Sequence, residues 1–385
     1  MNQPTLLQLP MMRREDLGRH GQAYSLARDA GTRGYAPRAS EYACPWHPAR
    51  GSKRSLLVLF ATLFSLTGLT AKALAGEPGS TKLTQEENRV VVQIDGKPFT
   101  EYWFGPTPDH PYVRPFMYPV LAPGGVGVTS DQINVKGGDH PHHRSLYVAH
   151  GDVNGVDHWS LTKQLKGEKQ PEQKHVKFEK VEGDTLVEDL QWQDNDFKPM
   201  LDERRTVRFF EFPDRSRGID FTLEFTPVSA SVKFADTKEA GLCSVRMANA
   251  ISAHATITES TGATATGDAK STKENAKAEN AVWGKAADWC DESGEIDGKP
   301  YGVAIFDNPA NPRHPSTWHV RLYGLMSANI FGLHDFDKAN PKGAGDFTID
   351  AGKTVTFKYR VVVHAGDAKA AGLDEKYKEY AETHK

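Results

Sequence analysis

One short stretch of the chain, residues 137–160, carries most of the side chains that could do chemistry. It holds five of the 15 histidines in 385 residues, interleaved with acidic, amide and indole groups. The set is Asp139, His140, His142, His143, His150, Asn154, Asp157, His158 and Trp159. Imidazole groups transfer protons near neutral pH and bind metal ions, and Asp, Asn and Trp side chains often contact sugars. The stretch therefore predicts a binding or catalytic site.

Three interpretations of these histidines compete. In an acid–base site, His142 or His143 would exchange protons with a sugar, and a carboxylate would be the partner. In a metal site, His140, His142 and His143 would be the ligands, although their spacing matches no zinc motif. In the third interpretation, the histidines cap turns and bond to the loop backbone. The spacing leaves all three open.

The chain after the first 76 residues has the pattern of β-strands. Polar and apolar residues alternate strictly over 354–361 and again over 221–225, as in half-buried strands. We expect a helix over residues 368–384. Over residues 256–280 we expect either a long exposed loop or a weak, polar strand pair. Many short strands separated by Gly, Pro, Asn and Asp favour one antiparallel β-sandwich domain over 77–385.

The same alternation predicts which polar groups share a sheet face. Over residues 318–323 the apolar side chains would face the core, and His319 and Arg321 would face the other way. Glu239 precedes a further strand that carries Arg246. Because a buried, unpaired Arg is costly, we expect these four polar residues to share a pocket with the histidines.

An apolar run near the N-terminus predicts export. Lys53 and Arg54 precede the apolar residues 56–69, and Ala73-Leu74-Ala75 follows as a cleavage site. We expect residues 1–52 to be a disordered or misannotated extension, residues 53–76 a signal peptide, and the mature protein periplasmic or secreted.

The charge balance argues against a nucleic-acid partner. Residues 1–76 carry ten Lys/Arg and four Asp/Glu, so with −3 for the whole chain the remainder carries −9. Nucleic-acid binding needs clustered Lys and Arg, and we also expect no membrane attachment after cleavage. Cys243 and Cys290 remain in this part, where an oxidising compartment would permit a disulfide.

Several motifs resemble the PmoA-like family of bacterial proteins. They are Gly138-Asp139-His140-Pro141-His142-His143-Arg144, the following 150–157, Glu239-Ala240-Gly241 with Arg246, and the segments 302–309, 314–324 and 329–332. The resemblance covers roughly 85–366 and implies an all-β, antiparallel, galactose-mutarotase-like supersandwich, a fold commonly used on carbohydrates. The family's name refers to a membrane copper enzyme with several transmembrane helices. No such segment follows residue 70, so we do not expect methane oxidation.

Together these features predict an exported protein that acts on a sugar or oligosaccharide by hydrolysis, elimination or epimerisation. The expected catalytic residues are His142, His143, Glu239 and Asp139, the last orienting an imidazole. The expected substrate-binding residues are His140, His150, Asn154, Asp157, Trp159, Arg246, His319 and Arg321. Trp159 would stack on a sugar ring, and Arg321 would bind hydroxyls or a carboxylate.

Two other functions remain as alternatives. The chain could be a non-catalytic module that binds glycans, or a metal-binding protein of the cell envelope. No cofactor is expected unless His140, His142 and His143 hold a divalent metal.

Overall fold

Antiparallel strands dominate the computed structural model, which describes residues 79–106, 113–135, 138–270 and 272–383. The chain divides into two units, Met1–Thr70 and Ala71–Lys385, and all described residues belong to the second. The expected extension and signal peptide lie outside the described residues. Among the described helices, none is long and apolar enough to cross a membrane.

The first of two large sheets contains the strands that carry the histidine segment. Its order is β1 (Thr81–Gln85), β2 (Arg89–Ile94), β3 (Lys97–Trp103), β4 (Phe116–Ala122), β6 (Leu146–His150), β12 (Ala240–Arg246), β18 (Leu325–Ala328) and β17 (Trp318–Arg321), with β5 (Val126–Gly127) paired to β4. All of these pairings are antiparallel.

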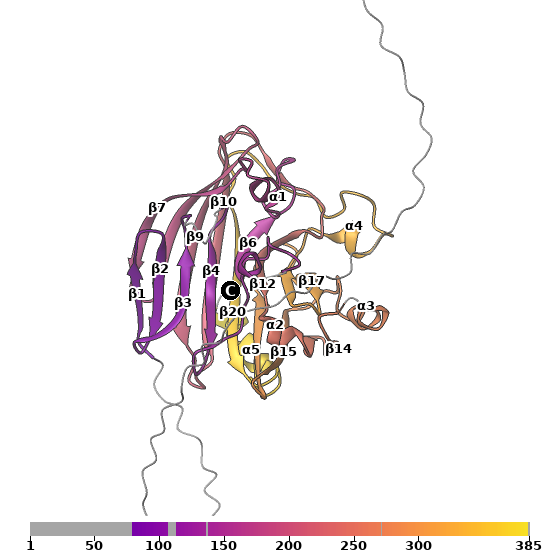
Figure 1. Cartoon of the computed structure of the whole chain (residues 1–385). Helices are drawn as coiled ribbons and strands as arrows, with labels where there is room; N and C mark the ends of the chain where they lie inside the picture. Colours follow the sequence, from indigo (N-terminus) through magenta and orange to yellow (C-terminus); the bar gives the residue numbers. More distant parts are fainter. Residues whose placement is uncertain (1–78, 107–112, 136–137, 271, 384–385) are drawn as a thin grey trace, which may run out of the picture. The chain divides into compact units, whose positions relative to one another are not determined.

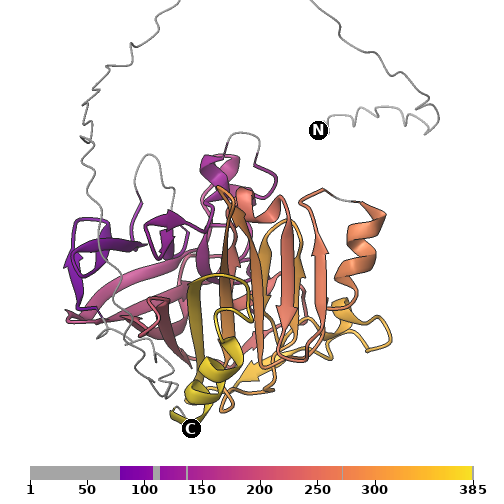
Figure 2. The same ribbon diagram turned by 90° about the horizontal axis from the view of Figure 1, so that it is seen from below.

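The second large sheet is built mainly from longer strands. Its order is β14 (Thr264–Gly267), β13 (Ala255–Glu259), β15 (Trp289–Ile296), β16 (Lys299–Asp307), β20 (Val355–Ala365), β10 (Arg217–Pro227), β9 (Pro199–Glu211), β8 (Thr185–Gln193) and β7 (Gln173–Glu182). Figure 1 shows β7, β9 and β10 behind β1 to β4, and the same layers are seen from below in Figure 2.

The remaining elements are short. They are the strand pair β11 (Val232–Phe234) and β19 (Phe347–Ile349), the 3-10 helix Gln132–Asn134, and the helices α1 (Thr162–Leu165), α2 (Asn249–Ser252), α3 (Lys273–Glu279), α4 (Leu333–Phe336) and α5 (Leu373–Thr383).

One apolar core lies between the two large sheets. Val92 and Val245 come from the first sheet and Leu223 and Val361 from the second, and all four are fully buried. In β10 the burial of side chains alternates along most of the strand, because successive side chains point to opposite faces. The predicted antiparallel β-sandwich with a C-terminal helix is confirmed.

The helical parts of the chain differ in detail from the prediction. The C-terminal helix begins at Leu373 and not at residue 368, because Gly372 has a φ of 59°, a left-handed conformation that a helix does not continue through. Residues 256–280 form the β13–β14 pair, as one alternative held, and also the unpredicted helix α3. Thr272 begins α3 by accepting a hydrogen bond from the Asn275 amide, as N-cap residues do.

The outer face of the first sheet supports the site. In β6, Val148 joins the core between the sheets, whereas Tyr147 and Ala149 join a second apolar cluster with Trp159. In β17, Trp318 and Val320 join the core, so the predicted placement of His319 and Arg321 on the opposite face is correct.

Truncating Leu373 should destabilise the sandwich. This side chain of α5 is 1% exposed and packs in a cluster with Trp289, Phe306 and Val362 of the second sheet. We expect Leu373→Ala to lower the free energy of unfolding by about 2–5 kcal/mol, measured by urea titration. Glu379→Ala, on the exposed side of the same helix, should stay within about 0.5 kcal/mol of wild type. Equal effects of the two changes would contradict docking of α5 on the sheet.

Candidate functional site

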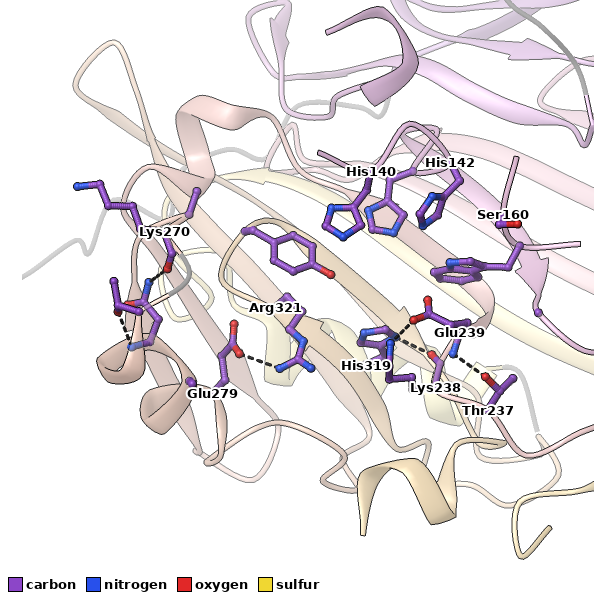
Figure 3. Close-up of a pocket in the computed structure, with 18 of the residues that line it drawn as sticks. His140, His142, Ser160, Thr237, Lys238, Glu239, Lys270, Glu279, His319 and Arg321 are labelled. Atoms are coloured by element: carbon purple, nitrogen blue, oxygen red, sulfur yellow. Dashed lines mark hydrogen bonds and ion pairs between the residues drawn. The ribbon is translucent and has the colours of Figure 1, made fainter. Parts of the chain in front are cut away.

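A cavity of about 600 Å³ lies on the outer face of the first sheet. Of the residues predicted from the sequence, it is lined by His140, His142, His143, Asp157, Trp159, Glu239, His319 and Arg321. Figure 3 shows His140 and His142 on one side and Glu239 and His319 facing them from the other. The structure therefore brings the segment before β12, the strand β17 and the histidine stretch to one place.

Arg114 holds the two loops of the histidine stretch together. Its Nη2 donates to the His142 carbonyl at 2.5 Å, and its Nη1 donates to the carbonyls of His158 at 3.1 Å and Trp159 at 3.0 Å. Its guanidinium also lies 4.7 Å from the centre of the Tyr147 ring. Burial lowers the pKa of Arg114 to about 10, so the group stays charged at neutral pH. These contacts offset the cost of burying the charge.

Arg246 fixes His143 in one neutral tautomer. Its Nη1 lies 3.2 Å from Nδ1 of His143, and a guanidinium can only donate, so this Nδ1 is an acceptor and carries no proton. Burial and the charges of His142 and Arg246 hold the pKa of His143 well below its usual value. The ring proton is then on Nε2. None of the described residues pairs with this atom, so the Nε2–H group is available to a ligand.

Arg246 itself does not line the cavity, which corrects its expected role as a substrate-binding residue. It is 3% exposed, and its Nη2 donates to Asp139 Oδ1 at 3.0 Å. The second oxygen of Asp139 lies 2.9 Å from Nδ1 of His140. Burial would raise the pKa of Asp139, but the charges of Arg246 and His140 outweigh it, and the pKa is lowered. The imidazole that Asp139 contacts is therefore that of His140, which is not one of the expected catalytic histidines.

His319 has the opposite tautomer to His143. Its Nδ1 lies 2.6 Å from the Lys238 carbonyl, an oxygen that can only accept, so Nδ1 carries the proton. Burial, with the charges of Lys238 and Arg321, lowers the pKa of His319 to about 3. The ring is therefore neutral at pH 7, and Nε2 has a lone pair. No described residue bonds to this Nε2, which leaves a proton acceptor on the cavity wall.

The other two imidazoles complete an aromatic wall. The ring of His140 is nearly parallel to those of His143, at 4.8 Å between ring centres, and Tyr323, at 4.9 Å, and the last two are 6.3 Å apart. The His142 ring lies edge-on to His143 at 4.4 Å. Burial and the charge of Arg114 lower the pKa of His142 to about 4, so this ring is also neutral at pH 7.

Each Lys or Arg side chain that lines the cavity in the described part of the chain is paired with an acid that also lines it. The pairs are Lys238 with Glu239, Arg321 with Glu279 at 2.8 Å, and Lys270 with Asp268 at 3.5 Å. A carboxylate ligand would have to compete with these acids. The expected binding of a carboxylate by Arg321 is therefore disfavoured, and a neutral polar ligand suits the cavity better.

Two predicted ligand contacts, His150 and Asn154, lie away from the cavity. His150 is fully buried on the core side of β6, where Nε2 donates to the Ala235 carbonyl at 3.0 Å. It shares a strand face with Val148, so alternation along β6 directs it into the core. Asn154 is an exposed turn residue with a φ of 51°, and its Oδ1 accepts from the Lys233 amide.

Two other predicted contacts line the cavity but are already engaged in holding the fold. Trp159 is 2% exposed and stacks parallel to His319 at 6.4 Å, so it offers an edge and not the expected open platform for a sugar ring. Oδ1 of Asp157 accepts from the amides of Trp159, at 2.8 Å, and Ser160, at 2.9 Å. Asp157 thus caps the turn after β6.

The geometry does not fit the expected metal ligands. Within residues 79–383, excluding the undescribed gaps, no group of three or more His, Cys, Asp or Glu side chains is placed to hold a metal ion. The rings of His140 and His143 are parallel to within 3°, so their in-plane lone pairs do not converge on one point. Cys243 and Cys290 are both buried and free, so the permitted disulfide is not formed.

Several site residues were missed by the sequence analysis. They are Arg114, Lys238, Glu279 and the segment from Asp268 to Ala276 that includes α3. The polar composition of residues 256–280 was the available signal for this segment. A lone Arg such as Arg114 carries no pattern at all.

The buried histidines should make stability depend on pH. Burial lowers the pKa of His150 to about 3, from 6.5 in the unfolded chain. The unfolded state then binds a proton that the native state does not, so this contribution is complete above pH 6.5 and is lost as the pH falls toward 3. We expect His150→Gln to flatten the fall in unfolding free energy between pH 6.5 and about 4 in urea titrations.

The matched control for this change is His254→Gln, because His254 is exposed. This variant should keep the pH profile of the wild type. A profile for His150→Gln that parallels the wild type over the same range would show that His150 is not held neutral by burial.

Comparison with known proteins places the chain in a family. No curated protein matches the sequence. Similar solved structures include a galactose mutarotase related enzyme from Lactobacillus acidophilus, with 9% identity, a TM-score of 0.34, and coverage of 74% of this chain and 97% of that chain. A GalM/aldose epimerase homologue from C. elegans has 8% identity, a TM-score of 0.29, and coverage of 75% and 99%. A galactose 1-epimerase from Lactobacillus acidophilus NCFM has 8% identity and a TM-score of 0.31. The match covers 75% of this chain and 100% of that chain.

All three TM-scores are below 0.5. The sequence profile that matches is described as a family of unknown function, DUF6807, and it covers residues 89–378. It includes every residue assigned to the cavity above and adds no support for the PmoA-like resemblance. The chain belongs to this DUF6807 family of unknown function.

Proposed function

We propose that the protein binds a neutral sugar in the cavity and catalyses proton transfer on it. The observation that supports this is the pair of neutral imidazoles, His143 and His319, whose Nε2 atoms are a hydrogen-bond donor and a proton acceptor. A reaction that moves a proton from a sugar needs an acceptor for it and a donor to stabilise the negative charge that develops. The proposed chemistry uses protein groups alone.

His143 is assigned as the donor that stabilises charge, and not as the acid or base expected from the sequence. Nδ1 cannot take a proton while the Arg246 guanidinium donates to it. A neutral imidazole N–H group can still stabilise an oxyanion in a water-poor site. His319 is assigned as the base, because protonation at Nε2 leaves its Nδ1–H bond to the Lys238 carbonyl intact. The negative charge that develops on the sugar offsets the burial that lowers the pKa of His319 to about 3.

Epimerisation or elimination suits these groups better than glycoside hydrolysis. Hydrolysis usually needs a carboxylic acid that holds a proton and a second carboxylate. The two Glu residues of the cavity, Glu239 and Glu279, are each engaged with a cation. In the favoured reactions, His319 takes a proton from the sugar and negative charge develops on an oxygen next to His143. Return of a proton to the opposite face of the same carbon gives an epimer. Elimination follows instead when the C–O bond at the neighbouring carbon breaks and the departing oxygen takes up the proton held by His319.

The rest of the wall suits a polyhydroxylated ligand. Tyr323, His140 and His142 present aromatic edges and polar atoms, and Glu239 is 39% exposed across the cavity. Sugar sites of this kind combine a few placed polar groups with aromatic surface. The paired charges of the lining favour an uncharged sugar over an acidic one.

Replacing either imidazole should slow turnover strongly. We expect His143→Gln and His319→Gln to lower the rate of sugar conversion about a hundredfold or more. The conversion is measured by proton NMR in D₂O with a panel of neutral mono- and oligosaccharides. The exposed His254→Gln variant is the control and should keep the wild-type rate. Binding without any conversion by the wild type would favour a glycan-binding module. Full activity of both cavity variants would contradict the proposed mechanism.

We also propose that the protein is exported. The support is the charged and apolar pattern of residues 53–76 with its Ala-Leu-Ala site. Mass spectrometry of the protein from the cell-envelope fraction should find a new N-terminus at or near Gly76. An intact chain that retains residues 56–69 would contradict export with cleavage.

A further inference from the structure

We infer that the cavity takes two sugar rings side by side, so that the ligand is a neutral disaccharide or a longer glycan. This inference rests on the proposed function and adds the class of substrate. The second ring would lie against the wall formed by residues 268–270, Thr272, Asn275 and Ala276, which we call the α3 wall.

The size of the cavity is the first argument. Its volume is about 600 Å³. One water molecule takes about 30 Å³ of liquid, so this space corresponds to about 20 water molecules. A hexose has about 12 non-hydrogen atoms and a disaccharide of hexoses about 23, and bonded atoms take less space than separate water molecules, so both fit. A single ring would leave close to half of the space to water.

The division of the cavity is the second argument. The imidazoles lie at one end, whereas Lys270 and Glu279 lie at the other, with Arg321 between the two groups (Figure 3). The proton-transfer groups, His143 and His319, therefore occupy only the first half. The described residues of the α3 wall include no histidine. This half of the cavity is therefore suited to binding a sugar ring and not to proton transfer.

Arg321 is placed to bind the link between two rings. Its Nη1 donates to Glu279 Oε2 at 2.8 Å, and its guanidinium lies 3.6 Å from the centre of the Trp283 ring. Glu279 is fixed in turn, because its Oε1 accepts from the Leu322 amide at 2.9 Å. Among the described residues, none bonds to Nε or Nη2 of Arg321. These donors can reach a hydroxyl or a glycosidic oxygen at the junction.

The α3 wall is preorganised and leaves room. Nδ2 of Asn275 donates to the carbonyls of Asp268 at 2.7 Å and Lys270 at 2.5 Å, which holds the loop against α3. Ala269 and Ala276 line this half with methyl groups only. A wall held in advance loses little conformational entropy when a ligand binds.

The test is to fill the second half with an indole. Ala276→Trp places the bulk on the α3 wall, and Ala281→Trp is the matched control, because Ala281 is exposed and does not line the cavity. Affinities for glucose, galactose and mannose, and for cellobiose, lactose and maltose, are measured by titration calorimetry. Ala269→Trp fills the same half from the loop and replaces Ala276→Trp if the latter does not fold by circular dichroism.

We expect wild type to bind at least one disaccharide tenfold or more tightly than its component sugars. Ala276→Trp should remove this advantage and leave monosaccharide affinity within about twofold, and Ala281→Trp should change neither. Equal affinity for both classes in wild type, or equal weakening of both by Ala276→Trp, would overturn the two-ring inference while the proposed function stands. Failure of every sugar to bind would overturn both.

Discussion

The contact between Arg246 and His143 is the constraint on which the site depends. The guanidinium donates to Nδ1 at 3.2 Å, and this excludes a proton from that atom. It therefore fixes a buried imidazole as a permanent donor at Nε2. The arrangement requires β12 to lie beside β6, because β12 carries Arg246 while the chain entering β6 carries His143. Asp139 and Tyr323 then contact the same guanidinium, so the pairing of the strands sets the chemistry of the cavity.

On the opposite wall of the cavity, a backbone contact fixes the tautomer of His319 in the same way. A backbone carbonyl beside Nδ1 of His319 leaves its Nε2 as an acceptor, and burial keeps both rings neutral at pH 7. Each Lys or Arg that lines the cavity among the described residues is paired with an acid of the same lining, so oriented hydrogen-bonding atoms supply much of the polarity of the site. Such atoms need no reorganisation when charge develops on a substrate.

The sequence predicted what depends on local periodicity. Strict alternation in β10 and β17 identified the core face and placed His319 and Arg321 on the other face, because a strand repeats every two residues. The same rule places His150 in the core beside Val148, whereas the composition of the histidine stretch predicted a ligand contact for this residue. The pairing of His143 with Arg246 joins residues 103 positions apart. No local pattern encodes it, and the same holds for Arg114 and for the α3 wall.

The most direct measurement is the tautomer of each cavity histidine, by long-range ¹H–¹⁵N NMR of the ¹⁵N-labelled protein at pH 7. The signals are assigned with His143→Gln and His319→Gln variants. Two neutral rings are expected, with the proton of His143 on Nε2 and that of His319 on Nδ1. An imidazolium at either position, or the same tautomer at both, would contradict the account.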